Sequence, residues 1–323
     1  MIDALIASEL KQRMRGKRWW ILLGVWMLLL LGLVALVRAG ATRAAEFSGE
    51  FVQVGPTMFG SLALFVLGLS CLVVPSLTAT AINGERDRGT LAVLQATLYR
   101  PKDVLLAKFS AAFVTAAVFV LATIPLAIWS ASEGGVSAVR AVVVYVVLLA
   151  MCALFIAIGL AASSLVRRPG LSALAAYAGV FLLTAGLPIL FGLSMLSATP
   201  EPVTQRIGDE VITYTEPRIG WRWLLLAPDP FVILADAAPR QRSRFVSDPL
   251  AVIREGARAS RQQSRSPVFR DGVGSAEEAP PEPPPLWPVG LAIDVGVIAL
   301  CCYEVLRKLH VPARHLAPGE RVA

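Results

Sequence analysis

The sequence predicts an all-α polytopic membrane protein with six transmembrane helices, an N-terminal interfacial helix, a short cytoplasmic helix after the second span and a large external loop between helices 5 and 6. Composition is the first observation: the chain is 56% hydrophobic and 16% charged, with a mean hydropathy of +0.65, above that of a soluble domain. The second observation is the length of its apolar runs. Crossing about 30 Å of hydrocarbon takes roughly 20 apolar residues in a helix, and six runs reach that length.

The six predicted spans lie near Trp19–Val37, Thr57–Ile82, Val104–Ser130, Ala138–Val166, Leu171–Ser197 and Leu286–Leu306. The first run follows basic residues, as in a signal peptide, but no small-residue cleavage pattern follows it convincingly. We therefore interpret it as a retained first span. The predicted organisation is a cytoplasmic amphipathic helix over 1–18, five spans within 19–197, an external loop over 198–285, a sixth span over 286–306 and a cytoplasmic tail over 307–323.

Basic residues predict the orientation. If six helices alternate, most Lys and Arg residues outside the long loop fall on one side, and the opposite short loops hold only Arg38, Arg43 and Arg140. The positive-inside rule then places both termini in the cytoplasm. We interpret the net charge of +7 as this topological signal and not as a nucleic-acid-binding surface. The clustered residues are Lys11, Arg13, Arg15, Lys17, Arg18, Arg86, Arg88, Arg100, Lys102, Arg167, Arg168, Arg307, Lys308, Arg314 and Arg321.

The N-terminal segment is amphipathic. Leu5, Ile6 and Leu10 alternate with charged residues, which favours a helix lying on the inner membrane surface. It leads into Trp19 and Trp20, residues typical of the membrane interface.

The external loop over 198–285 breaks the pattern of short connections. Val211–Tyr214 alternates as in a hairpin strand. The segment over about 219–238 is apolar but carries three charges, each costing about 2.5–3.5 kcal/mol at a helix centre, so we predict a re-entrant or interfacial segment and not a span. If it did cross, the basic C-terminus would lie outside and the following arginines inside. These are Arg240, Arg242, Arg244, Arg254, Arg258, Arg261, Arg265 and Arg270.

The sequence lacks two common catalytic motifs. The chain has no G-x-x-x-x-G-K-[ST] motif and no H-E-x-x-H motif, and its two histidines, His310 and His315, lie in the tail. Cys71, Cys152, Cys301 and Cys302 lie inside predicted spans, where packing is the favoured interpretation.

Two acidic residues of the sixth span differ in their expected roles. Asp294 is the one acidic residue well inside a span and so a candidate intramembrane polar site, although packing or an interhelical hydrogen bond explains a lone acid more simply than ion coupling. Glu304 is expected to pair locally with Arg307 or Lys308.

A charged cluster followed by an apolar repeat separates spans two and three, in "INGERDRGTLAVLQATLYRPKDVLLAKF", residues 82–109. Glu85 and Arg88 are spaced to pair, with Arg86 beside them. Gly89 ends one helix, and Thr90 is the expected N-cap of a second. That helix presents Leu91, Leu94 and Leu98 on one face, which predicts a surface that docks a partner or simply lies on lipid.

This segment resembles the one after the second helix in permease subunits of ATP-binding cassette (ABC) exporters of the type 2 family. The matching residues are Glu85, Gly89, Thr90, Leu91, Leu94, Arg100, Asp103, Val104 and Lys108. The chain departs from the pattern at Ala96–Leu98, where Thr-Pro is usual before the Arg, and at Ala107, where Gly is common. "GLAASSLVRRPGLSALAAYAGVFLL" is similar to the turn between the fourth and fifth spans of these permeases. "LWPVGLAIDVGVIAL" with "VPARHLAPGERVA" is similar to the end of actinobacterial members.

The resemblance implies a permease subunit that lies in a bacterial cell membrane and contacts its lipid. A second permease subunit, identical or paralogous, would pair with it. A separate ABC ATPase dimer would bind ATP and Mg, so this chain would need no cofactor. A coupling helix over about 84–99 would contact the ATPase through Glu85, Arg86, Arg88, Gly89, Thr90, Leu91, Leu94 and Leu98. Two other functions stay open: a secondary transporter or channel using Asp294, and a sensor whose external loop binds a ligand. The sequence does not predict the transported substrate.

Overall fold

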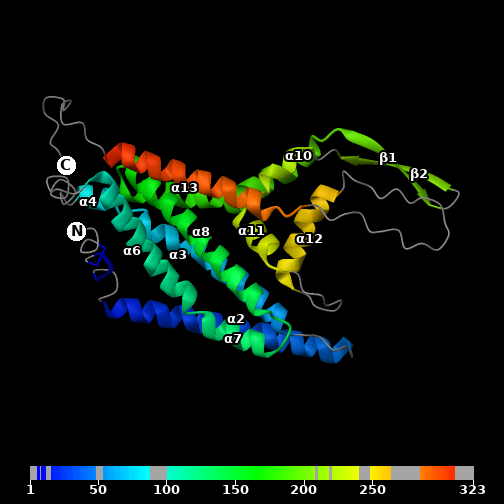
Figure 1. The fold of residues 1–323 in the computed structure, drawn as a ribbon, viewed down its shortest axis with the longest axis horizontal. Coiled ribbons are helices and arrows are strands. Elements are labelled where there is room, and N and C mark those ends of the chain that lie inside the picture. Colours follow the sequence, from blue (N-terminus) through cyan, green and yellow to red (C-terminus); the bar gives the residue numbers. More distant parts are fainter. Residues whose placement is uncertain are drawn as a thin grey trace.

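Long helices run side by side and form an elongated bundle (Figure 1). The computed structural model describes residues 6–7, 9–11, 16–48, 54–87, 100–207, 210–217, 220–239, 248–262 and 284–309. The helices of the bundle are α2 (Lys17–Ser48), α3 (Val54–Thr78), α6 (Pro101–Leu121), α7 (Ile124–Ser132), α8 (Ala138–Leu165), α9 (Pro169–Phe181), α10 (Leu187–Leu196) and α13 (Trp287–Leu309).

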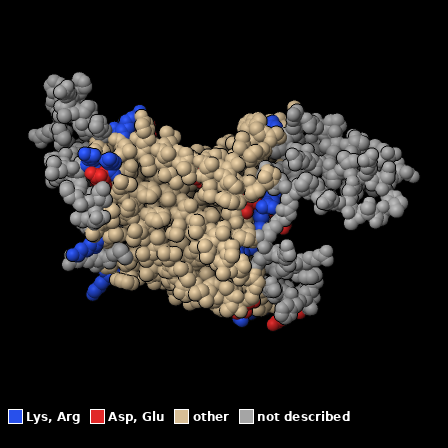
Figure 2. Space-filling view, in the orientation of Figure 1, with Lys and Arg blue, Asp and Glu red and all other residues tan. Residues whose placement is uncertain are grey.

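Six helical stretches of the described chain are long and apolar enough to cross a membrane, which confirms the predicted all-α polytopic fold. They are Trp19–Ala44, Val54–Asp87, Pro101–Ser132, Ala138–Leu165, Pro169–Leu196 and Trp287–Leu309. Charged side chains gather mainly at the two ends of the molecule and leave a broad uncharged band between them (Figure 2). This distribution keeps charges near water on both sides of a bilayer.

Helix α8 lies at the centre of the bundle. It packs against α3, α6, α9 and α13. From Ala141 to Leu165 its sequence contains no Asp, Glu, Lys, Arg or His. A helix that is apolar on every side is stable only when other helices or lipid surround it, and most of the second half of α8 is buried by its neighbours.

Two of the long spans are interrupted near a proline. The third span is divided into α6 and α7, and Pro125 lies in the first turn of α7. Thr123, between the two helices, is buried, and its hydroxyl lies 2.7 Å from the hydroxyl of Tyr145 on α8. The fifth span contains a π-helix, η1 (Leu182–Gly186), just before Pro188 in α10. Proline lacks the N–H that a regular helix needs, so each interruption has a local cause.

One glycine sets the closest approach between α3 and α8. A Cβ atom at Gly159 would overlap the Thr78 hydroxyl oxygen and lie 3.4 Å from the Pro75 carbonyl oxygen. Small residues permit this kind of contact between membrane helices, where packing replaces the hydrophobic effect as the main attraction.

The described part of the loop between the fifth and sixth spans surrounds a short buried helix. It begins with the antiparallel hairpin β1 (Pro200–Ile207) and β2 (Glu210–Pro217), which includes the predicted strand. The 3-10 helix η2 (Arg222–Leu225), α11 (Pro230–Ala237) and α12 (Pro249–Gln262) follow. Helix α11 packs against α8, α12 and α13, and α12 packs against α3. We call the end of the bundle that carries these elements the hairpin end.

Buried ion pairs hold α11 and α12 to the bundle. Arg140, at the start of α8, is fully buried; it pairs with Asp248 and donates a hydrogen bond to the Pro239 carbonyl at 3.0 Å. Arg254 of α12 is also buried and donates to the Ala238 carbonyl at 3.1 Å. The sequence analysis treated both arginines only as topological markers, because which loop charge meets which helix end depends on the folded loop.

Asp236 of α11 caps a helix far away in the sequence. One carboxylate oxygen accepts hydrogen bonds from the Leu286 and Trp287 amides at 2.5 and 3.1 Å, where α13 begins. The other oxygen pairs with Arg258 at 2.9 Å. The first amides of a helix have no partner within the helix, so Asp236 supplies one from another element.

We predict that Gly159→Ala destabilises the protein, because the added methyl group must displace Thr78 or separate α3 from α8. The expected cost is about 1–3 kcal/mol, measured as a lower midpoint of thermal unfolding in detergent. Gly68→Ala is the matched control, because a Cβ atom at Gly68 has no neighbour within 4 Å. Equal midpoints for the two variants would contradict the contact.

Candidate functional site

The candidate site lies at the end of the bundle opposite the hairpin. Here α3 is followed by turns over residues 79–82 and the short helix α4 (Asn83–Asp87), α6 and α9 begin, and α8 ends. We call this the junction end. Helix α4 carries Glu85 and Arg86, the first two predicted coupling residues. The others, Arg88, Gly89, Thr90, Leu91, Leu94 and Leu98, lie outside the described residues.

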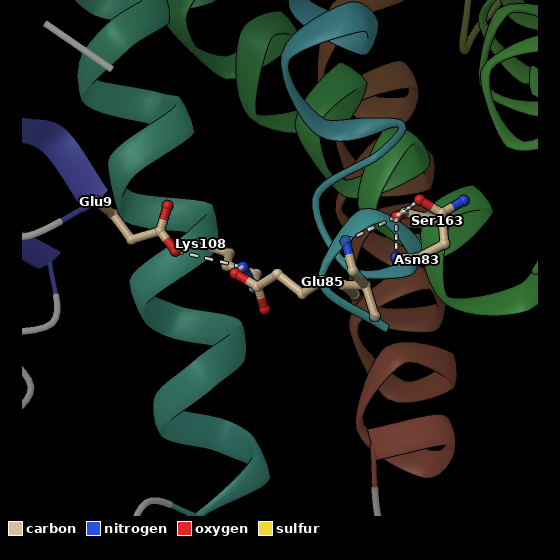
Figure 3. A network of polar contacts seen from close by, with 6 residues as sticks. Glu9, Asn83, Glu85, Lys108 and Ser163 are labelled. Carbon is tan, nitrogen blue, oxygen red and sulfur yellow. Dashed lines mark hydrogen bonds and ion pairs between the residues drawn. The ribbon is translucent and has the colours of Figure 1, made fainter. Parts of the chain in front are cut away.

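Lys108 forms the centre of an ion-pair network at the junction end (Figure 3). Its ammonium nitrogen lies 2.5 Å from a carboxylate oxygen of Glu85 in α4 and 3.3 Å from one of Glu9 in the N-terminal segment. Lys108 is 3% exposed, so both contacts form largely away from water. A buried lysine without such partners would be strongly destabilising. The network therefore ties three segments that are distant in the sequence.

A second set of hydrogen bonds joins α4 to the end of α8. The Ser163 hydroxyl oxygen accepts from the backbone amides of Ile82 and Asn83 at 2.9 and 3.2 Å. The Asn83 side chain donates to the Val166 carbonyl at 3.1 Å. Figure 3 shows Asn83 and Ser163 on the opposite side of α4 from Lys108. These bonds satisfy amides at the point where the helix of the second span is interrupted.

Helix α6 begins three residues before Val104, where the third span is predicted to start. Pro101 is its first residue, and the backbone amide of Arg100 donates to an Asp103 carboxylate oxygen at 3.0 Å. Proline at the first helical position and an acid in the first turn both favour a helix start. The third span is thus anchored by Pro101 and Asp103 at its end and by Lys108 two turns further on.

Helix α9 is also attached at the junction end. Ser172 is buried and donates to the Ala79 carbonyl at 2.5 Å, in the turn that precedes α4. Residues 79–85 are thus connected to α9 through Ser172, to α8 through Ser163 and to α6 through Lys108. A displacement of α4 would therefore also displace α6, α8 and α9, which belong to three other spans.

The structure brings together residues that the sequence analysis did not. Glu85 is expected to pair with Arg88, which lies outside the described residues, and among the described residues it pairs with Lys108. Lys108 was singled out only by the family resemblance, and Glu9, Asn83 and Ser163 were not singled out. One signal was present: a lysine inside an apolar run needs a nearby acid. The identity of that acid depends on how the helices pack.

Asp294, the other candidate residue, lies in α13 and is 2% exposed. Among the described residues, neither of its carboxylate oxygens has a hydrogen-bond partner. The expected interhelical hydrogen bond is therefore not found in this part of the chain. Glu304, further along the same helix, forms the predicted local ion pair with Arg307 at 2.9 Å.

Comparison with known families identifies the chain. The family model described as ABC-2 family transporter protein matches residues 4–243, which include the first five spans and the whole junction end. The chain belongs to the ABC-2 transporter family. It is thus a multi-pass permease of the ABC transporter class. A search of curated proteins finds no match to this permease.

We predict that Ser163→Ala destabilises the permease, because it leaves the buried amides of Ile82 and Asn83 without their acceptor. An unsatisfied buried group costs about 1–3 kcal/mol, so thermal unfolding in detergent should begin at a lower temperature. Ser132→Ala is the control, since the Ser132 hydroxyl is exposed and bonds only within its own helix. A midpoint equal to that of the control would show that Ser163 does not stabilise the junction end.

Proposed function

We propose that this permease forms the translocation pathway of an ATP-driven exporter and is coupled to a separate ABC ATPase subunit. One observation supports this most directly: Glu85, at the start of the predicted coupling segment, is joined to α6 by its ion pair with the buried Lys108. The chain also lacks a P-loop motif, so ATP and Mg would be bound by the partner chain.

The junction end offers a physical route for coupling. Closure of the ATPase dimer would push on residues 84–99 and so on α4. The Lys108 network would carry this force to α6, and the Asn83–Ser163 contacts would carry it to α8. A rigid set of polar contacts transmits a displacement better than exposed side chains, which rearrange in water. Coupling further requires that the ATPase make different contacts in the inward and outward states.

The proposed assembly contains two permease subunits, identical or paralogous, and an ATPase dimer. It lies in the cell membrane of a bacterium with both permease termini and the junction end in the cytoplasm. The orientation is supported by the basic residues Arg86, Arg100, Lys102, Arg167 and Arg168 close to the junction end. Helix α10 has no buried residue, so its sides are open to lipid or to the second permease subunit.

We predict that Leu94→Asp prevents the ATPase from binding, because a carboxylate on the apolar face of the predicted coupling helix cannot enter an apolar groove without a large desolvation cost. The measurement is co-purification of the ATPase with the permease from detergent. Val252→Asp is the control, since Val252 is an exposed apolar residue at the hairpin end. Normal co-purification and transport with Leu94→Asp would refute the proposed docking face.

We predict that Lys108→Met separates binding from coupling. The ATPase should still co-purify, because Lys108 is buried and cannot contact it directly, but transport should fall by at least tenfold as the link from α4 to α6 is lost. Lys102→Met is the control, because Lys102 is an exposed lysine of the same helix. Transport at the control level in Lys108→Met would contradict the proposed route.

Asp294 is buried and has no hydrogen-bond partner among the described residues, which favours one alternative function, a secondary transporter driven through this residue. The two functions differ in their energy source. Transport that stops when the partner ATPase is inactivated supports the exporter. Transport that continues with an inactive ATPase, and is lost in Asp294→Asn, would support the alternative.

A further inference from the structure

Asp294 has a structural setting that the proposed ATPase coupling does not explain. It is 2% exposed within a single chain, and the described residues provide no hydrogen bond to either of its carboxylate oxygens. An ionised carboxylate in such a place lacks both water and a compensating charge, which is the costliest state for a buried acid. Because its own chain already covers Asp294, a second subunit could reach it only if α13 moved.

The face of α13 that carries Asp294 lies against the loop segment just before α11, at Ala227. Gly290 is one turn before Asp294 on the same face of the helix. A Cβ atom at Gly290 would overlap the Ala227 carbonyl oxygen and lie 2.7 Å from the Ile233 side chain. The backbone of the loop therefore touches α13 directly at this level, two residues before Asp229.

Asp229 is an acidic residue close to this contact, two residues after Ala227. It is 3% exposed and caps α11, with one carboxylate oxygen accepting from the Phe231 and Val232 amides at 2.7 and 3.1 Å. The two carboxyl groups are close enough to interact electrostatically. Burial raises the pKa of Asp229 to about 6, although the two backbone hydrogen bonds favour its ionised form.

The cations of the surrounding helices are engaged elsewhere. Helix α8 contributes Arg140, which is paired with Asp248, and the uncharged groups of Tyr145 and Cys152, and α3 contributes Cys71, which lies within electrostatic range of Asp229. Asp236 of α11 is engaged with Arg258 and the start of α13. The charged residues of α6, Lys102, Asp103 and Lys108, belong to its first turns at the junction end.

A proton is the ligand that fits this site. Two carboxylates near each other in a low-dielectric interior repel strongly when both are ionised, so the binding of one proton by either of them is favoured. A metal ion would need several more ligands, and the described residues contain no group of three or more His, Cys, Asp or Glu side chains able to hold one.

We propose that Asp229 and Asp294 form a carboxyl pair that binds one proton, and that this proton holds α13 against the loop segment that contains Ala227 and Asp229, at the hairpin end. The proton comes from solvent and returns to solvent, with no other bond formed or broken. Release of the proton would leave a negative charge on each carboxylate, and their repulsion would push α13 and α11 apart. The pair would thus make the packing of the sixth span sensitive to pH.

The direction of the pH effect follows from the proton. The unfolded chain releases its carboxyl protons near pH 4, whereas the folded pair retains one to higher pH, so stability is greatest in acid and falls as the pair loses its proton. The full-length permease in detergent should therefore show a midpoint of thermal unfolding that falls by several degrees between about pH 5 and about pH 8. Its infrared difference spectrum across this range should contain the carbonyl band of a buried carboxylic acid.

We expect Asp294→Asn to remove both signals, because asparagine has the shape of the protonated acid and cannot ionise. Its unfolding midpoint at alkaline pH should equal or exceed that of the unmodified permease. Glu304→Gln is the matched control, since it removes an acid from the same helix that is already paired with Arg307, and it should retain both signals.

Two results would overturn the proposal. One is a neutral-pH spectrum of the unmodified permease without a carboxylic-acid band, and the other is an unchanged pH dependence in Asp294→Asn. The variant Asp229→Asn distinguishes a proton bound by the pair from a proton bound by Asp294 alone. Loss of the pH-dependent band in this variant supports the pair, whereas a band that persists shows that Asp294 binds the proton alone. If Asp294→Asn fails to fold, the spectrum of the unmodified permease and that of Asp229→Asn decide the question.

Discussion

Every polar group that this permease removes from water must find a partner inside the chain, and most of the structure depends on that requirement. Hydrocarbon offers no hydrogen bonds, so the spans are helices whose backbone groups pair internally. The requirement becomes hardest to meet where a helix ends or is interrupted. At those points the structure places Asp236 on the first amides of α13, and Ser163 on the amides that follow α3. The polar contacts are thus concentrated at the two ends of the bundle.

The two ends solve this problem in different ways. At the hairpin end, Arg140, Asp248, Arg254, Asp236 and Arg258 form a buried network that closes the loop onto α8 and α13. At the junction end the network is smaller and is centred on Lys108, next to a segment that the family resemblance assigns to ATPase contact. Buried ion pairs contribute little net stability but strongly favour one arrangement over others. This property suits an element that must keep its orientation while force passes through it.

Asp294 is the exception among the buried charges. The other buried acids of the described chain, such as Asp236 and Asp248, have arginine or backbone amides as partners, whereas both oxygens of Asp294 lack a hydrogen bond among the described residues. A buried acid whose two oxygens both lack a hydrogen bond is a candidate for a site whose charge state can change. The fold thus contains a polar link at the junction end, where we propose that the ATPase docks, and, separately, a buried acid on the sixth span that we propose binds a solvent proton.

The sequence by itself determined the six spans and the ABC-2 resemblance, because span length, composition and motif residues are local properties of the chain. Only the tertiary structure decided which groups meet. Lys108 and Glu85 are 23 residues apart, Lys108 and Glu9 are 99 apart, and Asp236 and Leu286 are 50 apart. No periodicity links such residues. Their pairing follows from how the helices pack and from the cost of leaving any of these charges and amides buried alone.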